Sequence, residues 1–475
     1  MTTLAARARM NRWELPLVVT AAAFAVILGA ATVAVGPLLL AALIVLAFFA
    51  LVAIRPIVGA YAYLVTVPFI TGIDRGELVP NVRPNEVLQF FLTAAVLAGV
   101  LIQMKRGVNV RVHVTRLDRA IIALAAFASV WPLLWLVVRG HDPTSTDVQS
   151  TMVLWRLVAL YVLFRYVVRT AGQVRRCLWI LLTGASVLAV IAVIQALGLT
   201  TITSLFGADS GRGTATLSSA IAVGDYLAYS LAVVLALYLR HAAPRRVLGA
   251  IGVLLVIGSL GTGQFSAWIA ASIVVIAVAA HEHQLTRIGV RVLPVVAVAL
   301  LVAWPVVDQR LEGFGGSLGY PTSWHSRIDN LTSFFLPQLA GFNWVLGVRP
   351  DPVLPAPETW RNAIYLESGV LWLLWVGGIP LLIAFCWFVR AALRHTHRVA
   401  RGRSDVIGVV SLAAFGSLCA MAFLTLFDAH VQMRGGGDAL FILLGLSANR
   451  FVPASTRGEP RQDGDRFDRI GGGIR

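Results

Sequence analysis

The chain has 475 residues, of which 58% are hydrophobic and 13% are charged, and its formal net charge is +16. Soluble proteins carry about 25% charged residues, so this composition excludes an ordinary soluble globular protein. The basic residues are spread over many short connections, which argues against a nucleic-acid-binding surface and is typical of the loops between membrane spans.

The apolar residues form continuous runs rather than an alternating pattern. A bilayer core about 30 Å thick needs about 20 apolar residues per helix, and only helices or closed barrels satisfy their backbone polar groups inside it. Continuous runs favour helices. The sequence therefore predicts an all-α, polytopic integral membrane protein with about 14 transmembrane helices and one long extracytoplasmic loop. The expected helices cover residues 15–35, 38–54, 57–73, 86–104, 119–138, 150–168, 177–197, 217–239, 247–261, 265–280, 290–307, 364–389, 406–427 and 438–452.

These runs divide the chain into four parts. Residues 1–307 hold helices 1 to 11, and the ninth and tenth are short enough to form one re-entrant hairpin instead. Residues 308–363 are the extracytoplasmic loop, and residues 364–452 hold helices 12 to 14. Residues 453–475 are polar and rich in Gly and Arg, which predicts a disordered cytoplasmic tail.

The positions of the basic residues predict the orientation. With the N-terminus inside, the inner segments hold 29 Lys and Arg residues and the outer segments hold nine. Such a bias follows the positive-inside rule and puts both termini in the cytoplasm. We expect a multi-pass protein of a bacterial plasma membrane, with the first helix as an uncleaved anchor.

Ionisable residues enter the apolar spans only in their outer halves. They are Arg156, Asp225, Glu367, Asp428 and Asp438. A charge inside a membrane costs a few kcal/mol and faces a cavity or a partner. Pairing for packing alone, for example of Arg156 with Asp225, is one explanation. A polar cavity open to the outside explains the clustering of the whole set better.

The long loop combines aromatic and basic side chains, among them His325, Arg327, Arg349 and Trp360. Apolar residues between 328 and 335 recur at helical spacing, which predicts an amphipathic helix near the membrane surface. Arginine suits a bidentate grip on phosphate, and aromatic faces suit sugar rings or lipid chains. The loop therefore indicates a substrate with a phosphate and a sugar, although contact with lipid headgroups is the favoured interpretation for Arg349.

The connection between the last two expected helices holds Asp428, His430, Arg434 and Asp438 within 11 residues. An Asp that orients a His is a plausible acid–base pair, so Asp428 and His430 are candidate catalytic residues. A capped, solvated turn explains the same residues equally well. Glu367 is a third candidate base, which we expect in the first turn of helix 12.

Several short motifs occur in a recognisable order. They are Gly211–Thr214, Gly261–Gln264, Ser326–Ile328, Trp344–Val348, Asn362–Gly369 and Gly377–Pro380. Across residues 200–390 the chain resembles the O-antigen ligase and O-antigen polymerase superfamily of bacterial envelope glycosyltransferases. The earlier helices resemble the family only in topology.

The resemblance implies transfer of a glycan from a polyprenyl-pyrophosphate carrier to an acceptor hydroxyl on a glycan or glycolipid, outside the cytoplasm. It implies no nucleotide sugar, no metal and no other cofactor. The implied partners are these two substrates, membrane lipid and other polysaccharide-assembly proteins. The family arginines that grip the pyrophosphate correspond to Arg212 and Arg327, and Arg156, Arg434 and His325 are further candidates for substrate binding.

One motif departs from the family. The ligases carry a His-Asn pair before the helix that follows the long loop, and this chain has Arg361 and Asn362 there. An arginine in that place would suit binding of the anionic leaving group. Fourteen spans also favour a polymerase over a ligase.

Three other functions compete with this one. A secondary transporter or flippase would have access from both sides and a site near the midplane. A protein-mannosylating type of glycosyltransferase would carry an acidic pair in its first outer loop, where this chain has Gly36 and Pro37. A non-catalytic membrane scaffold would tolerate replacement of its outer ionisable residues.

Overall fold

The computed structural model describes residues 37–77, 82–105, 113–198, 212–312, 322–357 and 363–452. The first expected helix, the C-terminal tail and two parts of the long loop lie outside these ranges. The chain forms two compact units, one of residues 1–59 and 90–110 and the other of residues 60–89 and 111–475.

The described part of the smaller unit is helical. It holds α2 (Pro37–Ile54), the first residues of α3 (Pro56–Ile70) and most of α4 (Pro84–Lys105). Phe91 stacks on Phe48 with ring centroids 5.9 Å apart and meets the edge of Phe49 at 5.3 Å. Gly99 lies directly against the backbone of Ala53, so the two helices approach closely where no Cβ intervenes.

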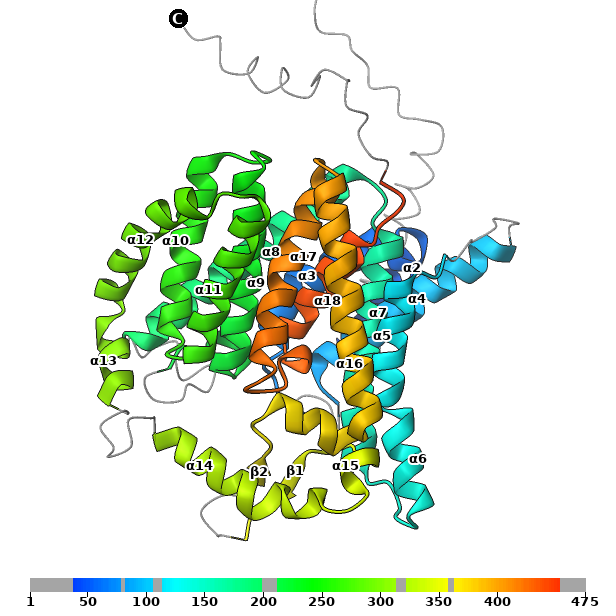
Figure 1. The fold of residues 1–475 in the computed structure, drawn as a ribbon. Coiled ribbons are helices and arrows are strands. Elements are labelled where there is room, and N and C mark those ends of the chain that lie inside the picture. The colour runs from blue at the N-terminus through cyan, green and yellow to red at the C-terminus, as the bar shows by residue number, and fades with distance from the viewer. Residues whose placement is uncertain are drawn as a thin grey trace, which may run out of the picture. The chain divides into compact units, whose positions relative to one another are not determined.

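The larger unit is a helical bundle built around α9. Its helices are α5 (Arg116–Phe127), α6 (Val130–Val138), α7 (Ser145–Val167), α8 (Ala171–Ala196), α9 (Ala220–Leu239), α10 (Arg245–Gly261), α11 (Phe265–His281), α12 (Leu285–Val302), α13 (Trp304–Glu312), α16 (Gly369–Gly402), α17 (Val406–Leu424) and α18 (Gly436–Ser447). Helix α9 packs against α8, α10, α11, α17 and α18 (Figure 1). Its most apolar stretch is 94% buried, which makes it the core of the bundle.

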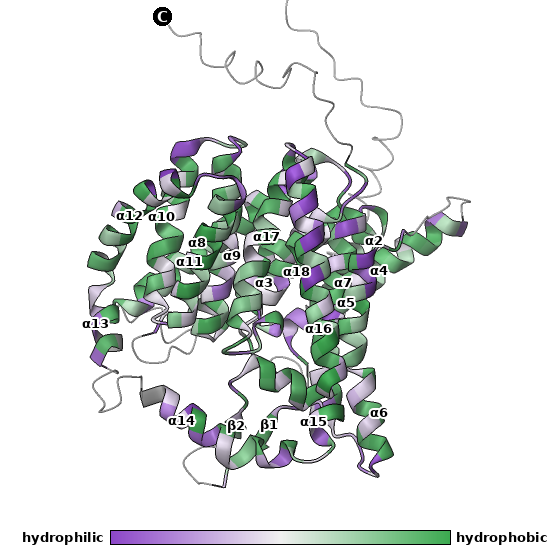
Figure 2. Ribbon diagram, in the orientation of Figure 1, coloured by the Kyte–Doolittle hydropathy of each residue, from purple (hydrophilic) through white to green (hydrophobic). Residues whose placement is uncertain are grey.

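Seven of the described helical segments are long and apolar enough to cross a membrane. They are Pro84–Lys105, Arg116–Val138, Ser145–Val167, Ala171–Ala196, Ala220–Leu239, Gly369–Gly402 and Val406–Leu424. Four shorter apolar helices accompany them. Hydrophobic residues cover the bodies of the helices and hydrophilic residues gather at their ends (Figure 2). The chain is thus an all-α protein suited to a membrane, as expected, whereas the count of fourteen spans stays a prediction.

Helices occupy the expected segments among the described residues, but several begin earlier than hydropathy indicates. Helices α5, α7 and α8 start at residues 116, 145 and 171, ahead of the expected 119, 150 and 177. Each is preceded by a threonine, Thr115, Thr144 or Thr170, whose side chain accepts the N3 backbone N–H while the N3 side chain accepts the threonine N–H. These capping boxes stabilise first turns that are too polar for a hydropathy criterion.

Two other boundaries differ for local reasons. The expected helix 290–307 breaks at Ala303 into α12 and α13, next to Pro305, which has no backbone N–H to continue the ladder. The expected helix 364–389 begins at Gly369, where the Ser368 side chain caps the backbone of Leu371. Glu367 was therefore placed wrongly in a first helical turn, since it lies in the connection before α16.

The long connection after α13 is structured where it is described. It contains α14 (Thr322–Asn330), a π turn η3 (Leu331–Phe335), a 3-10 turn η4 (Pro337–Leu339), α15 (Asn343–Leu346) and an antiparallel hairpin of β1 (Val353–Pro355) and β2 (Ala363–Tyr365). Helical turns thus cover the segment 328–335, as expected. Phe335 is buried against the edge of Trp375, at a centroid distance of 5.0 Å, while Ile328 is exposed.

Helix α15 docks into a break in α16. Gly378 has φ +63° and ψ −155°, a conformation open only to glycine, and a Cβ there would overlap the carbonyl oxygen of Val345. The indole N–H groups of Trp131 and Trp135, on α6, donate to the carbonyls that end α15 at 3.1 Å each. These contacts fix the connection that leads into β1 and the cavity described next.

Candidate functional site

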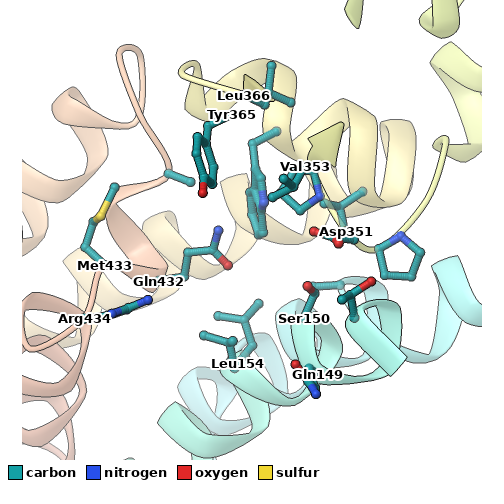
Figure 3. A pocket seen from close by; sticks show the side chains of 18 of the residues that line it. Gln149, Ser150, Leu154, Asp351, Val353, Tyr365, Leu366, Gln432, Met433 and Arg434 are labelled. Atoms are coloured by element: carbon teal, nitrogen blue, oxygen red, sulfur yellow. The ribbon is translucent and has the colours of Figure 1, made fainter. Parts of the chain in front are cut away.

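A cavity of about 580 Å³ lies in the larger unit, where six separate stretches of chain meet. Its walls come from the α3–α4 connection with the first turn of α4, Ala128 after α5, the first half of α7, the segment leading into β1, the segment from β2 to the start of α16, and the α17–α18 connection. Arg434 and Gln432 lie across the cavity from Asp351 and Ser150 (Figure 3). The charged residues that line it are Arg75, Arg83, Arg156, Arg434, Glu86, Asp351, Glu367 and Asp428.

Three arginines gather on one part of the wall. Arg75 Nη2 donates to Glu86 Oε1 at 2.8 Å, the Arg83 backbone N–H donates to Glu86 Oε2 at 3.1 Å, and Arg434 Nη1 donates to Asp74 Oδ1 at 2.8 Å. Burial and the charges of Arg434 and Arg75 together lower the pKa of Arg83 to about 10. The group holds more positive than negative charge, so a bound anion would relieve its mutual repulsion.

Arg83 also has a donor to spare. Its Nε is buried and has no hydrogen-bond partner among the residues that the structure describes. A buried donor without a partner costs about 1–3 kcal/mol, which an anionic ligand in the cavity would recover.

Arg156 lines the cavity from α7 and is held from behind. Its Nη1 lies 2.8 Å from Asp438 Oδ1, and its Nη2 donates to Asp438 Oδ2 at 3.3 Å. The hydroxyl of Tyr63 donates to the same carboxylate at 2.9 Å. The sequence suggested Asp225 as the partner of Arg156, and that pairing is wrong because Asp438, at the start of α18, takes this place.

Two carboxyl groups face the cavity near the start of α16. Glu367 Oε2 lies 2.5 Å from Arg327 Nε. Burial raises the pKa of Glu367, and the nearby Asp428 raises it further, against the opposing charge of Arg327. Burial also raises the pKa of Asp428, which accepts the N–H of Ala429 at 2.7 Å. Both groups are placed to exchange protons with a ligand in the cavity.

His430 lies behind this wall, away from the cavity lining. It is fully buried, and its Nδ1 lies 2.7 Å from Oδ2 of Asp225, which is also buried. The expected partner, Asp428, does not bond to the ring in this structure. Burial alone would lower the pKa of His430, but the Asp225 carboxylate outweighs this and raises it. His430 is therefore placed to act on the cavity through its neighbours.

Three other predicted residues, Arg327, Arg212 and His325, do not line the cavity. Arg327, on α14, reaches it only through Glu367. Arg212 lies beside the α10–α11 turn, where the N–H of Gly213 donates to the Gly261 carbonyl at 3.1 Å, and it does not line the cavity. His325 is on α14 and does not line it either. Arg361 lies outside the described residues.

Arg349, for which the sequence favours contact with lipid headgroups, has a partner within the protein. Its Nε and Nη2 donate to the two carboxylate oxygens of Asp147 at 3.2 and 3.0 Å. Asp147 is the N3 residue of the α7 capping box, and it also accepts the backbone N–H of Asp351 at 3.3 Å. The pair thus joins the start of α7 to the segment before β1 that holds Asp351 in the cavity wall.

Sequence reasoning missed Arg75, Arg83 and Asp351 as site residues. The available signal was the acidic and basic character of the short α3–α4 connection, where Asp74, Arg75, Glu77, Arg83 and Glu86 fall within 13 residues.

The site's chemistry depends on guanidinium and carboxylate groups. Within the described ranges, no group of three or more His, Cys, Asp or Glu side chains is arranged to hold a metal ion. Arginine forks suit phosphate groups in particular. No protein-family model matches this chain, and no curated protein matches its sequence.

Proposed function

We propose that this chain is an extracytoplasmic glycan polymerase or ligase of the bacterial plasma membrane. It transfers an oligosaccharide from a polyprenyl-pyrophosphate carrier to an acceptor hydroxyl during synthesis of a cell-surface polysaccharide. The observation that carries the proposal is the convergence of four arginines and three carboxyl groups of raised pKa, Asp351, Glu367 and Asp428, on one cavity. The proposal includes fourteen spans, cytoplasmic termini and a cavity on the outer side.

The arginines would bind the leaving group. In the reaction, the acceptor oxygen attacks the anomeric carbon, the bond from that carbon to the pyrophosphate oxygen breaks, and the carrier leaves as its pyrophosphate. Negative charge grows on the bridging oxygen as this bond breaks. Fixed donors such as Arg83, Arg156 and Arg434 stabilise that charge where water is excluded, and such stabilisation is often the largest contribution to catalysis.

A carboxylate would accept the proton of the acceptor hydroxyl. Glu367 and Asp428 both line the cavity, and a raised pKa brings each nearer to the pH at which a general base is most effective. Arg327 lies against Glu367 and orients it, and its charge opposes the rise in the pKa of Glu367 that burial causes. His430, held by Asp225, lies behind Asp428, and its charge would favour the ionised form of that carboxyl.

The size and the apolar lining of the cavity suit a sugar attached to a pyrophosphate. A volume of about 580 Å³ is within the range of pockets for small ligands, so it would hold the reacting unit and leave the rest of the glycan outside. Tyr365 and Trp372 contribute aromatic faces to the wall. Sugar rings pack on such faces, and the hydroxyl of Tyr365 supplies a polar end.

The test is deletion of the gene, followed by measurement of the length of surface glycans and of the polyprenyl-linked intermediates. Complementation uses the wild type, Arg83→Gln, Glu367→Gln and, as a matched control, Arg291→Gln, which removes an exposed arginine that bonds Tyr238. Accumulation of short lipid-linked repeats with loss of long polymer identifies a polymerase. Accumulation of full-length polymer on the carrier identifies a ligase.

Two outcomes would count against the proposal. An unchanged carrier-linked pool after deletion would exclude the transferase and favour a transporter or flippase. Full complementation by both Arg83→Gln and Glu367→Gln would show that the cavity is not where the reaction occurs.

A further inference from the structure

Helix α7 carries two arginines that are held in the same way. Each pairs with an aspartate, and each aspartate also accepts a tyrosine hydroxyl and a backbone N–H at the start of a helix. We name them the cavity triad, Tyr63–Asp438–Arg156, and the buried triad, Tyr161–Asp118–Arg165. The two sets have the same residue types, so the differences between their surroundings are informative.

In the cavity triad, the aspartate is buried and hydrogen-bonded through both oxygens. Asp438 has no exposed surface, and its oxygens accept the Tyr63 hydroxyl at 2.9 Å, Arg156 Nη2 at 3.3 Å and the Gly435 N–H at 2.9 Å. Arg156 Nη1 lies 2.8 Å from Oδ1 as an ion pair. Tyr63 is fully buried as well. Because α18 begins at this carboxylate, any movement of Asp438 would break the first turn of that helix. The buried carboxylate of Asp438 therefore holds the Arg156 guanidinium in place.

The buried triad uses its arginine entirely inside the protein. The Arg165 side chain is 3% exposed, and its Nη2 donates to the carbonyl of His113 at 2.9 Å while Nη1 contacts Asp118 and Tyr161. The Arg156 side chain is 11% exposed and lines the cavity. A guanidinium has five N–H donors. Only Nη2 of Arg156 donates to Asp438, and the buried Nη1 has no hydrogen-bond partner among the described residues, so Arg156 has donors left for a ligand.

We propose that Arg156 is the fixed anchor for a phosphate-class anion in the cavity, and that Asp438 and Tyr63 are positioning residues for it. The anion, on the proposed function, is the pyrophosphate of the carrier. A charged side chain that can swing loses affinity, because binding must then order it, whereas an arginine already held in place binds at lower entropic cost. The two partners thus act through Arg156 and need not touch the ligand.

The test measures binding of labelled inorganic pyrophosphate to the full-length protein in nanodiscs, at fixed salt. The variants are Tyr63→Phe and Asp438→Asn, and their matched controls in the buried triad are Tyr161→Phe and Asp118→Asn. Thermal unfolding of each variant is recorded in parallel. The unfolding data separate loss of stability, which all four changes cause, from loss of binding.

We expect Tyr63→Phe to weaken pyrophosphate binding about fivefold, as for loss of one hydrogen bond, and Asp438→Asn to weaken it about tenfold or more. The second result has a direction that charge alone does not predict. Asp438→Asn removes a negative charge beside the ligand, and that change by itself would tighten the binding of an anion. Both control variants should bind pyrophosphate as the wild type does.

Three results would overturn the proposal. They are a wild-type protein that binds no pyrophosphate, equal or tighter binding in both cavity-triad variants, and equal weakening by the control variants. If Asp438→Asn does not fold, Tyr63→Phe decides alone, since it keeps the charge and the shape. The glycan assay separates this inference from the proposed function. Triad-dependent pyrophosphate binding with unchanged glycans contradicts only the function, whereas shortened glycans with triad-independent binding contradict only the anchor.

Discussion

Replacement of Arg434 by glutamine should separate function from stability more cleanly than any other change in the cavity wall. The Arg434 side chain is 31% exposed, and its partner Asp74 is 55% exposed. Exposed ion pairs contribute about 0–1 kcal/mol to stability, so Arg434→Gln should leave thermal unfolding nearly unchanged. Arg156 differs, because its partner Asp438 is fully buried. Removal of one member of a buried pair costs about 3–5 kcal/mol.

The effect of Arg434→Gln on activity should be much larger. A hydrogen bond to a charged group contributes about 1.5–3 kcal/mol, and each 1.4 kcal/mol is a factor of ten, so loss of one contact with pyrophosphate should weaken binding about 10- to 150-fold. Arg75 and Arg83 remain in the wall and still attract the anion. Their charges limit the loss, so we expect a value near the lower limit.

The assay combines two measurements on the same purified variants. Thermal unfolding in detergent reports stability, and the length distribution of the surface glycan in complemented cells reports activity. Arg291→Gln serves as the control for loss of an exposed arginine that does not line the cavity. A fall in the unfolding midpoint of Arg434→Gln as large as that of Arg156→Gln would refute the assignment of a weak pair, and glycans of normal length would refute contact between Arg434 and the substrate.

Three further predictions concern separate parts of the molecule. Asp118→Asn should lower the free energy of unfolding by about 3 kcal/mol, because it leaves Arg165 buried without its counter-charge, while glycan length stays normal in cells that still make the protein. Gly378→Ala should cost about 1–3 kcal/mol, because only glycine adopts its backbone angles, and limited proteolysis should then cut near α15. Burial raises the pKa of Glu367 and Asp428, so each keeps its proton to a higher pH than an ordinary carboxyl does. The transfer rate should therefore rise with pH above the usual carboxyl range. Separate measurements on Glu367→Gln and Asp428→Asn in membranes show which group is responsible for that rise.

Much of the helical architecture could be predicted from the sequence, because the signal is local. Twenty consecutive apolar residues form a helix whatever their neighbours are. The errors occur where polar residues decide a boundary. Thr144 and Ser368 start their helices by accepting backbone N–H groups, one several residues before the apolar run and the other several residues after its expected start. Such caps depend on single side chains, which a hydropathy pattern does not weigh.

The site could be predicted only in outline. Clustering of ionisable residues at one end of the spans indicated a polar cavity, and a cavity is present. The partners were not predictable, because they come from distant parts of the chain. Asp225 and His430 are 205 residues apart, and Arg156 and Asp438 are 282 residues apart. Sequence proximity favoured Asp428 for His430, but the packing of α9 against α18 brings Asp225 there instead.

The two triads show why residue type alone does not reveal a binding site. Arg156 and Arg165 lie nine positions apart on one helix, and each is neutralised by an aspartate that also begins a helix. A sequence treats them alike, and each guanidinium is paired with one carboxylate. The two arginines differ in whether the guanidinium lines the cavity, where its N–H groups can reach a ligand. Arg165 Nη2 donates to a backbone carbonyl inside the protein, and Arg156 lines the cavity. The same Tyr–Asp–Arg arrangement therefore pairs a buried arginine at one end of α7. At the other end, on our proposal, it holds a fixed cation for an anionic substrate.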